Sequence, residues 1–258
     1  MWFKIKLYIN YLINSTNQHG VHSPFVFNLV TKCLYQKTPK KKINPYKRIK
    51  SILNKNSTVI TIQDFGKGSK IFKSNNRKVS DIAKVAGISL KKAKLLINLV
   101  TYFKPLNILE IGTSVGLASA TMATLNPKSR ITTLEGCKET SKVAQNLFYK
   151  LNLNNITIIE GEFKNTLHKT TSNSNFDFIY IDGNHQKKTT LAYFEQCLNS
   201  IHNNSFIIFD DINWTEEMNE AWKIIKQHPK VTVTIDLYFW GIVFFRKEQV
   251  KQHFIIRI

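Results

Sequence analysis

Acidic residues are scarce in the first part of this 258-residue chain. Residues 1–104 contain 21 Lys and Arg but only two acids, Asp64 and Asp81. Residues 105–258 contain 16 basic and 15 acidic residues, so most of the formal net charge of +20 lies before residue 105. This asymmetry predicts a basic N-terminal extension, residues 1–104, followed by a nearly neutral domain, residues 105–258.

The basic extension is compatible with several partners. Its charge would attract an acidic small molecule, a nucleic acid or an anionic membrane. The abundance of Lys, Asn and Ile along the whole chain is equally compatible with compositional drift in an AT-rich genome.

Cysteine is also sparse, and long hydrophobic runs are missing. Cys33, Cys137 and Cys197 form no C-x-x-C pair, which argues against a zinc site or a disulfide framework and favours a reducing, cytoplasmic compartment. No apolar run approaches the ~18 residues of a membrane-spanning helix. Residues 1–13 lack the cleavage site of a signal peptide and suit an amphipathic helix. We expect that helix to pack on the body of the protein rather than on a membrane surface.

A strand, a glycine turn and a helix are predicted across residues 107–116, Asn-Ile-Leu-Glu-Ile-Gly-Thr-Ser-Val-Gly. Close backbone approach at Gly112 and a helix that begins near Val115 make a cradle for a nucleotide. Glu135 ends the next apolar run and can accept hydrogen bonds from ribose hydroxyls. The G-x-G-x-x-G of dinucleotide enzymes is absent, which argues against a pyrophosphate ligand. Taken alone, the motif also fits a glycine-bearing turn in another α/β domain.

Apolar runs and helical segments alternate after residue 105. Five helices are predicted between the first six strands, and the last two strands are separated only by a tight turn near Trp240. This order predicts a parallel sheet with a final antiparallel strand. The predicted strands are 107–111, 130–135, 155–160, 176–182, 205–210, 231–237 and 240–246.

With these motifs in order, residues 95–246 resemble the class I S-adenosylmethionine-dependent methyltransferases. The resemblance implies an α/β fold with a Rossmann-like, seven-stranded methyltransferase sheet, parallel with an antiparallel last strand, preceded by a mainly helical extension. It implies that S-adenosylmethionine is the cofactor. In that family the first turn holds the methionine end of the cofactor, the acid after the second strand holds the ribose, and a polar residue after the third strand contacts the adenine. The residues so implied are Glu110, Gly112, Thr113, Ser114, Gly116, Glu135, Gly161, Glu162 and Asp182.

Acids also follow the fourth and fifth strands, as Asp182 and the pair Asp210-Asp211. Ligands of open α/β sheets bind at the carboxyl ends of the strands. Carboxylates that crowd together repel unless a divalent cation lies among them, and oxygen ligands suit Mg²⁺ or Ca²⁺ better than Zn²⁺. The Asp210-Asp211 pair is also compatible with acids placed at the start of a helix.

The segments Ile181-Asp182-Gly183-Asn184-His185 and Asp210-Asp211 resemble the metal-dependent O-methyltransferases of the catechol and macrolide branches. The resemblance implies Mg²⁺ held by Asp182, Asp210 and Asp211, with His185 as catalytic base and Asp182 as a further catalytic residue. The metal would lower the pKa of an acceptor hydroxyl, His185 would remove its proton, and the oxygen would attack the sulfonium methyl. Asp211 departs from the Asn of the catechol branch, and His185 also fits an exposed residue at a helix start.

An acceptor oxygen is favoured because the [DN]-P-P-[YF] segment of amine-directed methyltransferases is absent. We therefore predict a cytoplasmic S-adenosylmethionine-dependent O-methyltransferase that uses Mg²⁺ and acts on a hydroxyl of a small molecule. An acidic acceptor and a homodimer are both compatible with the sequence.

Two other functions remain open. Residues 79–96 resemble the helix-turn-helix of lac-repressor-type DNA-binding domains, which is compatible with a DNA-binding regulator that senses S-adenosylmethionine. The basic extension is compatible with a nucleic-acid methyltransferase that uses it as an RNA-binding arm. Against DNA reading, the second helix runs on toward the first strand, where methyltransferases commonly place a helix over the cofactor edge of the sheet.

Overall fold

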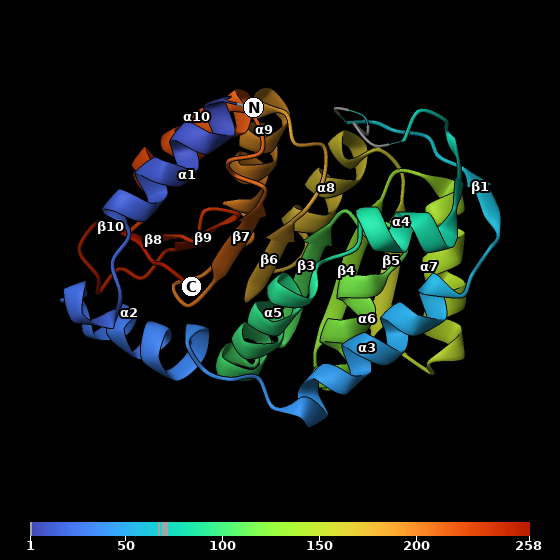
Figure 1. The fold of residues 1–258 in the computed structure, drawn as a ribbon, viewed down its shortest axis with the longest axis horizontal. Coiled ribbons are helices and arrows are strands. Elements are labelled where there is room, and N and C mark those ends of the chain that lie inside the picture. Colours follow the sequence, from blue (N-terminus) through green and yellow to red (C-terminus); the bar gives the residue numbers. More distant parts are fainter. Residues whose placement is uncertain (1, 67, 69–71) are drawn as a thin grey trace. The chain divides into compact units, whose positions relative to one another are not determined.

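The computed structural model describes residues 2–66, 68 and 72–258, which divide into two compact units. The first unit combines Met1–Tyr35 with Leu167–Ile258, and the second unit is Gln36–Thr166. Both are α/β (Figure 1). The predicted division at residue 104 concerns charge and function along the chain, and it stays a prediction. Among the described residues, no helix is both long and apolar enough to cross a membrane.

The second unit is built around three parallel strands in the order β3-β4-β5. Figure 1 shows α5 and α6 lying in front of these strands. A separate antiparallel pair joins β1 to β2. The elements are α3 (Lys40–Asn54), β1 (Val59–Thr61), β2 (Asn76–Lys78), α4 (Val79–Val85), α5 (Leu90–Phe103), β3 (Asn107–Ile111), α6 (Leu117–Leu125), β4 (Arg130–Glu135), α7 (Lys138–Lys150) and β5 (Ile156–Glu160), and α8 (Phe163–Ser172) crosses into the first unit.

The first unit contains strands in the order β10-β8-β9-β7-β6. β9 is antiparallel to both β7 and β8, whereas β6 with β7 and β8 with β10 are parallel. Every residue of β6, β7 and β9 is buried, as expected for central strands covered on both faces. The elements are α1 (Trp2–Asn14), η1 (Gln18–Gly20), α2 (Pro24–Leu29), the π-helical η2 (Val30–Leu34), β6 (Phe178–Ile181), α9 (Lys187–Cys197), β7 (Phe206–Asp210), α10 (Glu216–Gln227), β8 (Val233–Asp236), β9 (Trp240–Phe244) and β10 (Gln252–Ile255).

The predicted Rossmann-like α/β class is confirmed, and all seven predicted strands are present. The strand count is corrected by β10, which adds an eighth strand to the predicted seven and pairs in parallel with β8, Gln252 opposite Val233. Only four residues long, β10 carries too little alternation to be recognised, and it exists because β8 offers it an edge to pair with.

The N-terminal extension is mainly helical, as predicted. The segment that resembles a helix-turn-helix, residues 79–96, forms α4 and the first half of α5. α4 and α5 are separated by the expected break around Gly87. All six residues from Leu95 to Val100 are buried, and α5 contacts α6. This helix is therefore largely a packing helix of the second unit.

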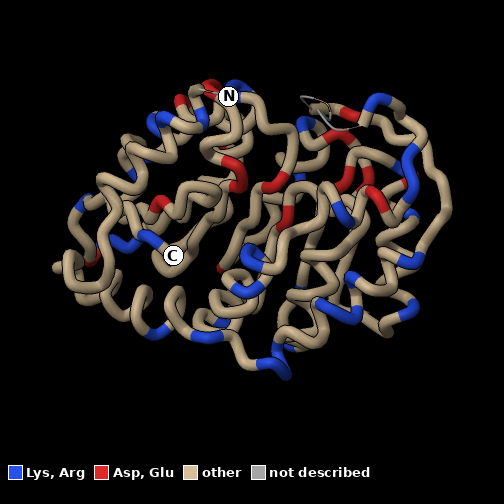
Figure 2. Tube along the Cα trace, viewed as in Figure 1, with Lys and Arg blue, Asp and Glu red and all other residues tan. Residues whose placement is uncertain are grey.

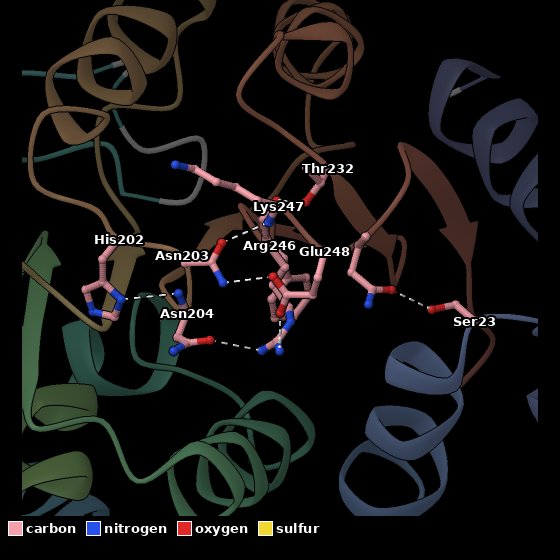
Figure 3. Close-up of polar contacts among 10 residues, drawn as sticks. Ser23, His202, Asn203, Asn204, Thr232, Arg246, Lys247 and Glu248 are labelled. Carbon is pink, nitrogen blue, oxygen red and sulfur yellow. Dashed lines mark hydrogen bonds and ion pairs between the residues drawn. The ribbon is translucent and has the colours of Figure 1, made fainter.

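Segments from both chain ends meet within the first unit. The Tyr11 hydroxyl donates a hydrogen bond to the backbone oxygen of Ile256 (2.8 Å), and Thr16 forms a parallel bridge with Ile256. The Ser23 hydroxyl, which caps α2, donates to the Gln249 side chain (Figure 3). These contacts fasten α1 and α2 to the end of the chain.

A second set of polar contacts fixes the turn after β9 (Figure 3). The Asn203 side chain accepts from the Lys247 backbone amide (2.8 Å) and donates to Glu248 (2.9 Å). Arg246 pairs with Glu248 and donates to the Asn204 side chain. The turn is thereby bound to the loop that precedes β7.

A tryptophan packs flat against the central antiparallel strand. Trp222 of α10 is 1% exposed, and its indole nitrogen donates to Asp236 Oδ2 at 2.9 Å. A Cβ atom at Gly241 of β9 would lie 2.6 Å from the Trp222 ring. Glycine at 241 thus allows α10 to approach the sheet.

We predict that Gly241→Ala lowers the free energy of unfolding by about 1–3 kcal/mol, because the added methyl overpacks a site that has no room for it. Urea denaturation measures the loss. Combining it with Trp222→Leu should cost less than the sum of the two single substitutions, because the clash is then relieved. A loss below about 0.5 kcal/mol for Gly241→Ala would contradict the proposed close contact.

Candidate active site

The predicted glycine turn joins β3 to α6 in the second unit. The backbone amides of Gly112 and Thr113 both donate to the Leu134 oxygen, at 3.0 and 3.1 Å. Gly112 has φ 110° and Gly116 has φ 81°, a region that favours glycine. A Cβ atom at Gly116 would lie 2.7 Å from the Phe148 ring. The two glycines are therefore required by the path of the backbone.

Glu135 ends β4 and joins the turn to the start of α7. Its Oε2 accepts from the Ser114 backbone amide (2.7 Å) and its Oε1 accepts from the Cys137 backbone amide (2.9 Å). Burial raises the pKa of this carboxyl, and the amides of Cys137 and Ser114 oppose part of the rise. The Thr140 side chain and the Gly136 backbone amide also stabilise the carboxylate, and its contact with a ligand hydroxyl stays a prediction.

Glu110 is enclosed in the interior of the second unit. Its side chain is fully buried, and it accepts hydrogen bonds from the hydroxyls of Ser119 and Thr133, the latter at 2.6 Å. The Thr113 and Thr133 hydroxyls also share a hydrogen bond of 2.6 Å. This environment supports a role in positioning the turn, and contact of Glu110 with the cofactor stays a prediction.

Gly161 and Glu162 follow β5, as predicted. The Gly161 amide donates to the Glu135 backbone oxygen at 2.9 Å. The Glu162 side chain is 38% exposed and pairs with Lys164 at 2.6 Å. Both residues lie at the carboxyl end of the β3-β4-β5 strands, and their contact with an adenine stays a prediction.

In the first unit, Asp182 and His185 follow β6 and lie close together. His185 Nε2 is 3.5 Å from Asp182 Oδ1, and the Tyr180 hydroxyl donates to Asp182 Oδ2 at 3.3 Å. Asn184 and His185 have φ values of 68° and 50°, so the loop turns sharply to bring the imidazole back toward the carboxylate.

The acids at the end of β7, Asp210 and Asp211, also affect the pKa of His185. Asp210 is buried, and its Oδ1 accepts from the Asp211 amide at 2.9 Å. Burial has the largest single effect on the His185 pKa and lowers it. The hydrogen bond with Asp182 and the charges of Asp182, Asp210 and Asp211 outweigh burial, so the His185 pKa is raised overall.

Two further residues at this site had no clear signal in the sequence. The Trp214 ring meets the His185 ring edge to face at 5.7 Å, and Lys4 Nζ lies 5.9 Å from the Trp214 ring centre. Trp214 follows the Asp210-Asp211 pair by three residues, and the sequence alone gives its ring no defined role. Lys4 is 210 positions away along the chain, and no local pattern links it to this ring.

The oxygen donors expected for a metal are present but are not gathered into a cluster. Among the residues that the structure describes, no three His, Cys, Asp or Glu side chains are grouped closely enough to hold an ion. Asp182 is engaged by His185 and Tyr180, and Asp210 by the Asp211 amide. Asp182, Asp210 and Asp211 therefore do not form a preformed metal site.

Comparisons with solved structures agree with this fold. An O-methyltransferase from Bacillus cereus in complex with SAH is 20% identical, with a TM-score of 0.55 over 85% of this chain and 96% of that one. SAH-bound Podospora anserina methyltransferase PaMTH1 is 17% identical, with a TM-score of 0.58 over 82% and 98%. The O-methyltransferase TomG from Streptomyces achromogenes, in complex with SAM, is 16% identical, with a TM-score of 0.55 over 78% and 98%.

Sequence comparison identifies the family. No curated protein matches the chain. The family model described as O-methyltransferase matches residues 71–237, which begin inside the predicted extension and include both the glycine turn and the Asp182–Asp211 region. With that match and the methyltransferase fold, the chain belongs to the O-methyltransferase family of class I S-adenosylmethionine-dependent enzymes.

Proposed function

We propose that this protein transfers a methyl group from S-adenosylmethionine to a hydroxyl of a small-molecule acceptor. The observation that carries the proposal is the pairing of His185 with Asp182, beside the acids of β7, in a chain of the O-methyltransferase family. An imidazole supported by a carboxylate is suited to take a proton from a hydroxyl.

The second unit supplies the groups that we assign to the cofactor. Gly112, Ser114 and Gly116 form a turn with positive φ angles, where the backbone can approach a ligand closely. We assign Glu135, at the end of β4, to the ribose hydroxyls. We assign Glu162, whose side chain is 38% exposed, to a polar edge of the adenine. When bound, S-adenosylmethionine supplies an electrophilic methyl group.

The first unit supplies the groups that we assign to proton transfer. His185 takes the proton of the acceptor hydroxyl, and Asp182 stabilises the imidazolium that forms. The oxygen then bonds to the methyl carbon as the bond from that carbon to the sulfonium sulfur breaks, which leaves S-adenosylhomocysteine. The proton released per turnover leaves through His185. Trp214 packs against the imidazole and limits its orientation.

Magnesium is a further part of the proposal, with Asp182, Asp210 and Asp211 as its ligands. Their oxygen chemistry suits this ion. Binding would require these carboxylates to draw together from their present hydrogen bonds. A bound metal would lower the pKa of the acceptor hydroxyl and so assist the loss of its proton to His185.

The setting of the reaction is also proposed. A cytoplasmic location is supported by Cys33, Cys137 and Cys197, which are all buried and form no disulfide. The excess of basic residues in 1–104 favours an acidic acceptor.

The central test is incubation of the full chain with methyl-labelled S-adenosylmethionine and, in parallel reactions, a small-metabolite extract or total RNA, with products identified by mass. We expect a labelled methyl ether. Labelled RNA, with no labelled small molecule, would instead favour the nucleic-acid alternative.

We predict that Glu135→Gln weakens S-adenosylmethionine binding about 10- to 100-fold, because an amide NH₂ would face a backbone N–H donor and remove an acceptor. Isothermal titration calorimetry measures the dissociation constant. Glu139→Gln is the matched control, since Glu139 lies at the start of α7, is exposed and pairs with Lys142. Equal effects of both substitutions would argue against a role for Glu135 in binding.

We predict that Asp182→Ala abolishes turnover and leaves S-adenosylmethionine affinity largely intact, and that His185→Gln lowers kcat about 10²- to 10⁴-fold. Asp182→Ala removes the partner of the proton acceptor, and His185→Gln removes the proton acceptor itself. Single-turnover methyl transfer and calorimetry separate the two quantities. If Asp182→Ala weakens cofactor binding as much as it slows turnover, Asp182 serves the cofactor instead.

We predict that EDTA stops the reaction and that added Mg²⁺ restores it, because the acceptor hydroxyl would lose its metal-assisted ionisation. Methyl transfer is measured after chelation and dialysis, with a melting curve to verify that the fold is retained. Full activity after chelation would remove the metal from the mechanism while leaving His185 as the base.

A further inference from the structure

The first helix carries an exposed apolar face. Its six exposed large apolar side chains range from 37% to 83% exposed. At the α-helical 100° per residue, they fall within a single arc of about 140°. They are Trp2, Ile5, Tyr8, Ile9, Leu12 and Ile13.

The opposite face of α1 is fastened to the first unit. Tyr11 is buried and donates to the Ile256 backbone oxygen at 2.8 Å. The Tyr238 hydroxyl donates to the Lys4 backbone oxygen at 3.1 Å. The Tyr238 ring packs edge to face, at 5.0 Å, on Tyr8, which lies at the edge of the apolar arc nearest to Tyr11. The helix is therefore held in a defined orientation that presents its apolar arc outward.

The charge beside this arc is positive. Lys4 and Lys6 are exposed and lie on either side of the apolar side chains. Residues 1–63 contain no acid at all, so none of the red positions in Figure 2 belongs to α1. An apolar stripe bordered by lysines, with a tryptophan at its end, is typical of helices that lie in a membrane interface.

We propose that α1 docks the protein onto an anionic bilayer surface, with its apolar arc at the boundary between headgroups and acyl chains. With 13 residues, the helix is too short to span a bilayer and would lie along it. Lys6 would meet anionic headgroups, whereas the Lys4 ammonium lies near the Trp214 ring. Self-association through the same face would bring the lysines of two copies together, and α1 has no acid to pair with them. The inference does not depend on the proposed methyl transfer.

The test is co-sedimentation of the full chain with vesicles. We expect binding to vesicles of phosphatidylglycerol mixed with phosphatidylcholine, weaker binding to phosphatidylcholine alone, and release as salt is raised. Equal binding to both kinds of vesicle would overturn the assignment to an anionic surface.

Paired charge substitutions locate the binding surface. Ile9→Asp with Ile13→Asp should weaken vesicle binding at least about tenfold, because two apolar side chains that would enter the bilayer become charged. The control is Ile224→Asp with Tyr149→Asp, which makes the same charge change at positions that are 48% and 84% exposed outside α1. A melting curve verifies folding, and Trp2→Ser provides a milder variant if the double variant unfolds.

Three results would overturn the proposal. They are an equal loss of binding in the α1 and control variants, no binding to either kind of vesicle, and a dimer without lipid that the α1 variant dissociates. Sedimentation equilibrium without vesicles tests the last. All three can be read without methyltransferase activity, so failure here is distinct from failure of the proposed reaction.

Discussion

The buried carboxylate of Glu135 is the interaction on which the organisation of the second unit depends. It accepts from the amide of Ser114 in the turn after β3 and from the amide of Cys137 at the start of α7. Two segments separated along the chain are thereby held at the carboxyl end of one parallel sheet. Because such an edge collects loops that need not pack, it is where an α/β protein can present backbone and carboxylates to a ligand.

The same principle operates in the first unit with a different result. Asp182, Asp210 and Asp211 follow two adjacent parallel strands, and their negative charge acts together on His185. In water these charges would be screened, whereas here they outweigh the effect of burial and raise the pKa of the imidazole. In the function that we propose, the second unit binds the cofactor and the first unit accepts the proton.

The N-terminal helix has to satisfy two surroundings at once. Tyr11 is buried and hydrogen-bonded to the end of the chain, while Trp2 and Ile13 on the other side are the most exposed of the large apolar side chains of α1. The expectation that this helix packs on the body is met by one face only. The helix is apolar on two faces, and only one of them packs on the first unit.

The sequence by itself determined the order of strands and helices, the turn at Gly112 and the family, since periodicity, glycine and strand-end acids are local signals. It could not reveal β10, because a four-residue strand exists only where β8 offers an edge. Nor could it show that Glu110 is enclosed by hydroxyls or that Lys4 lies over Trp214. Burial and long-range contact depend on which surfaces meet after folding, so only the tertiary structure decided them.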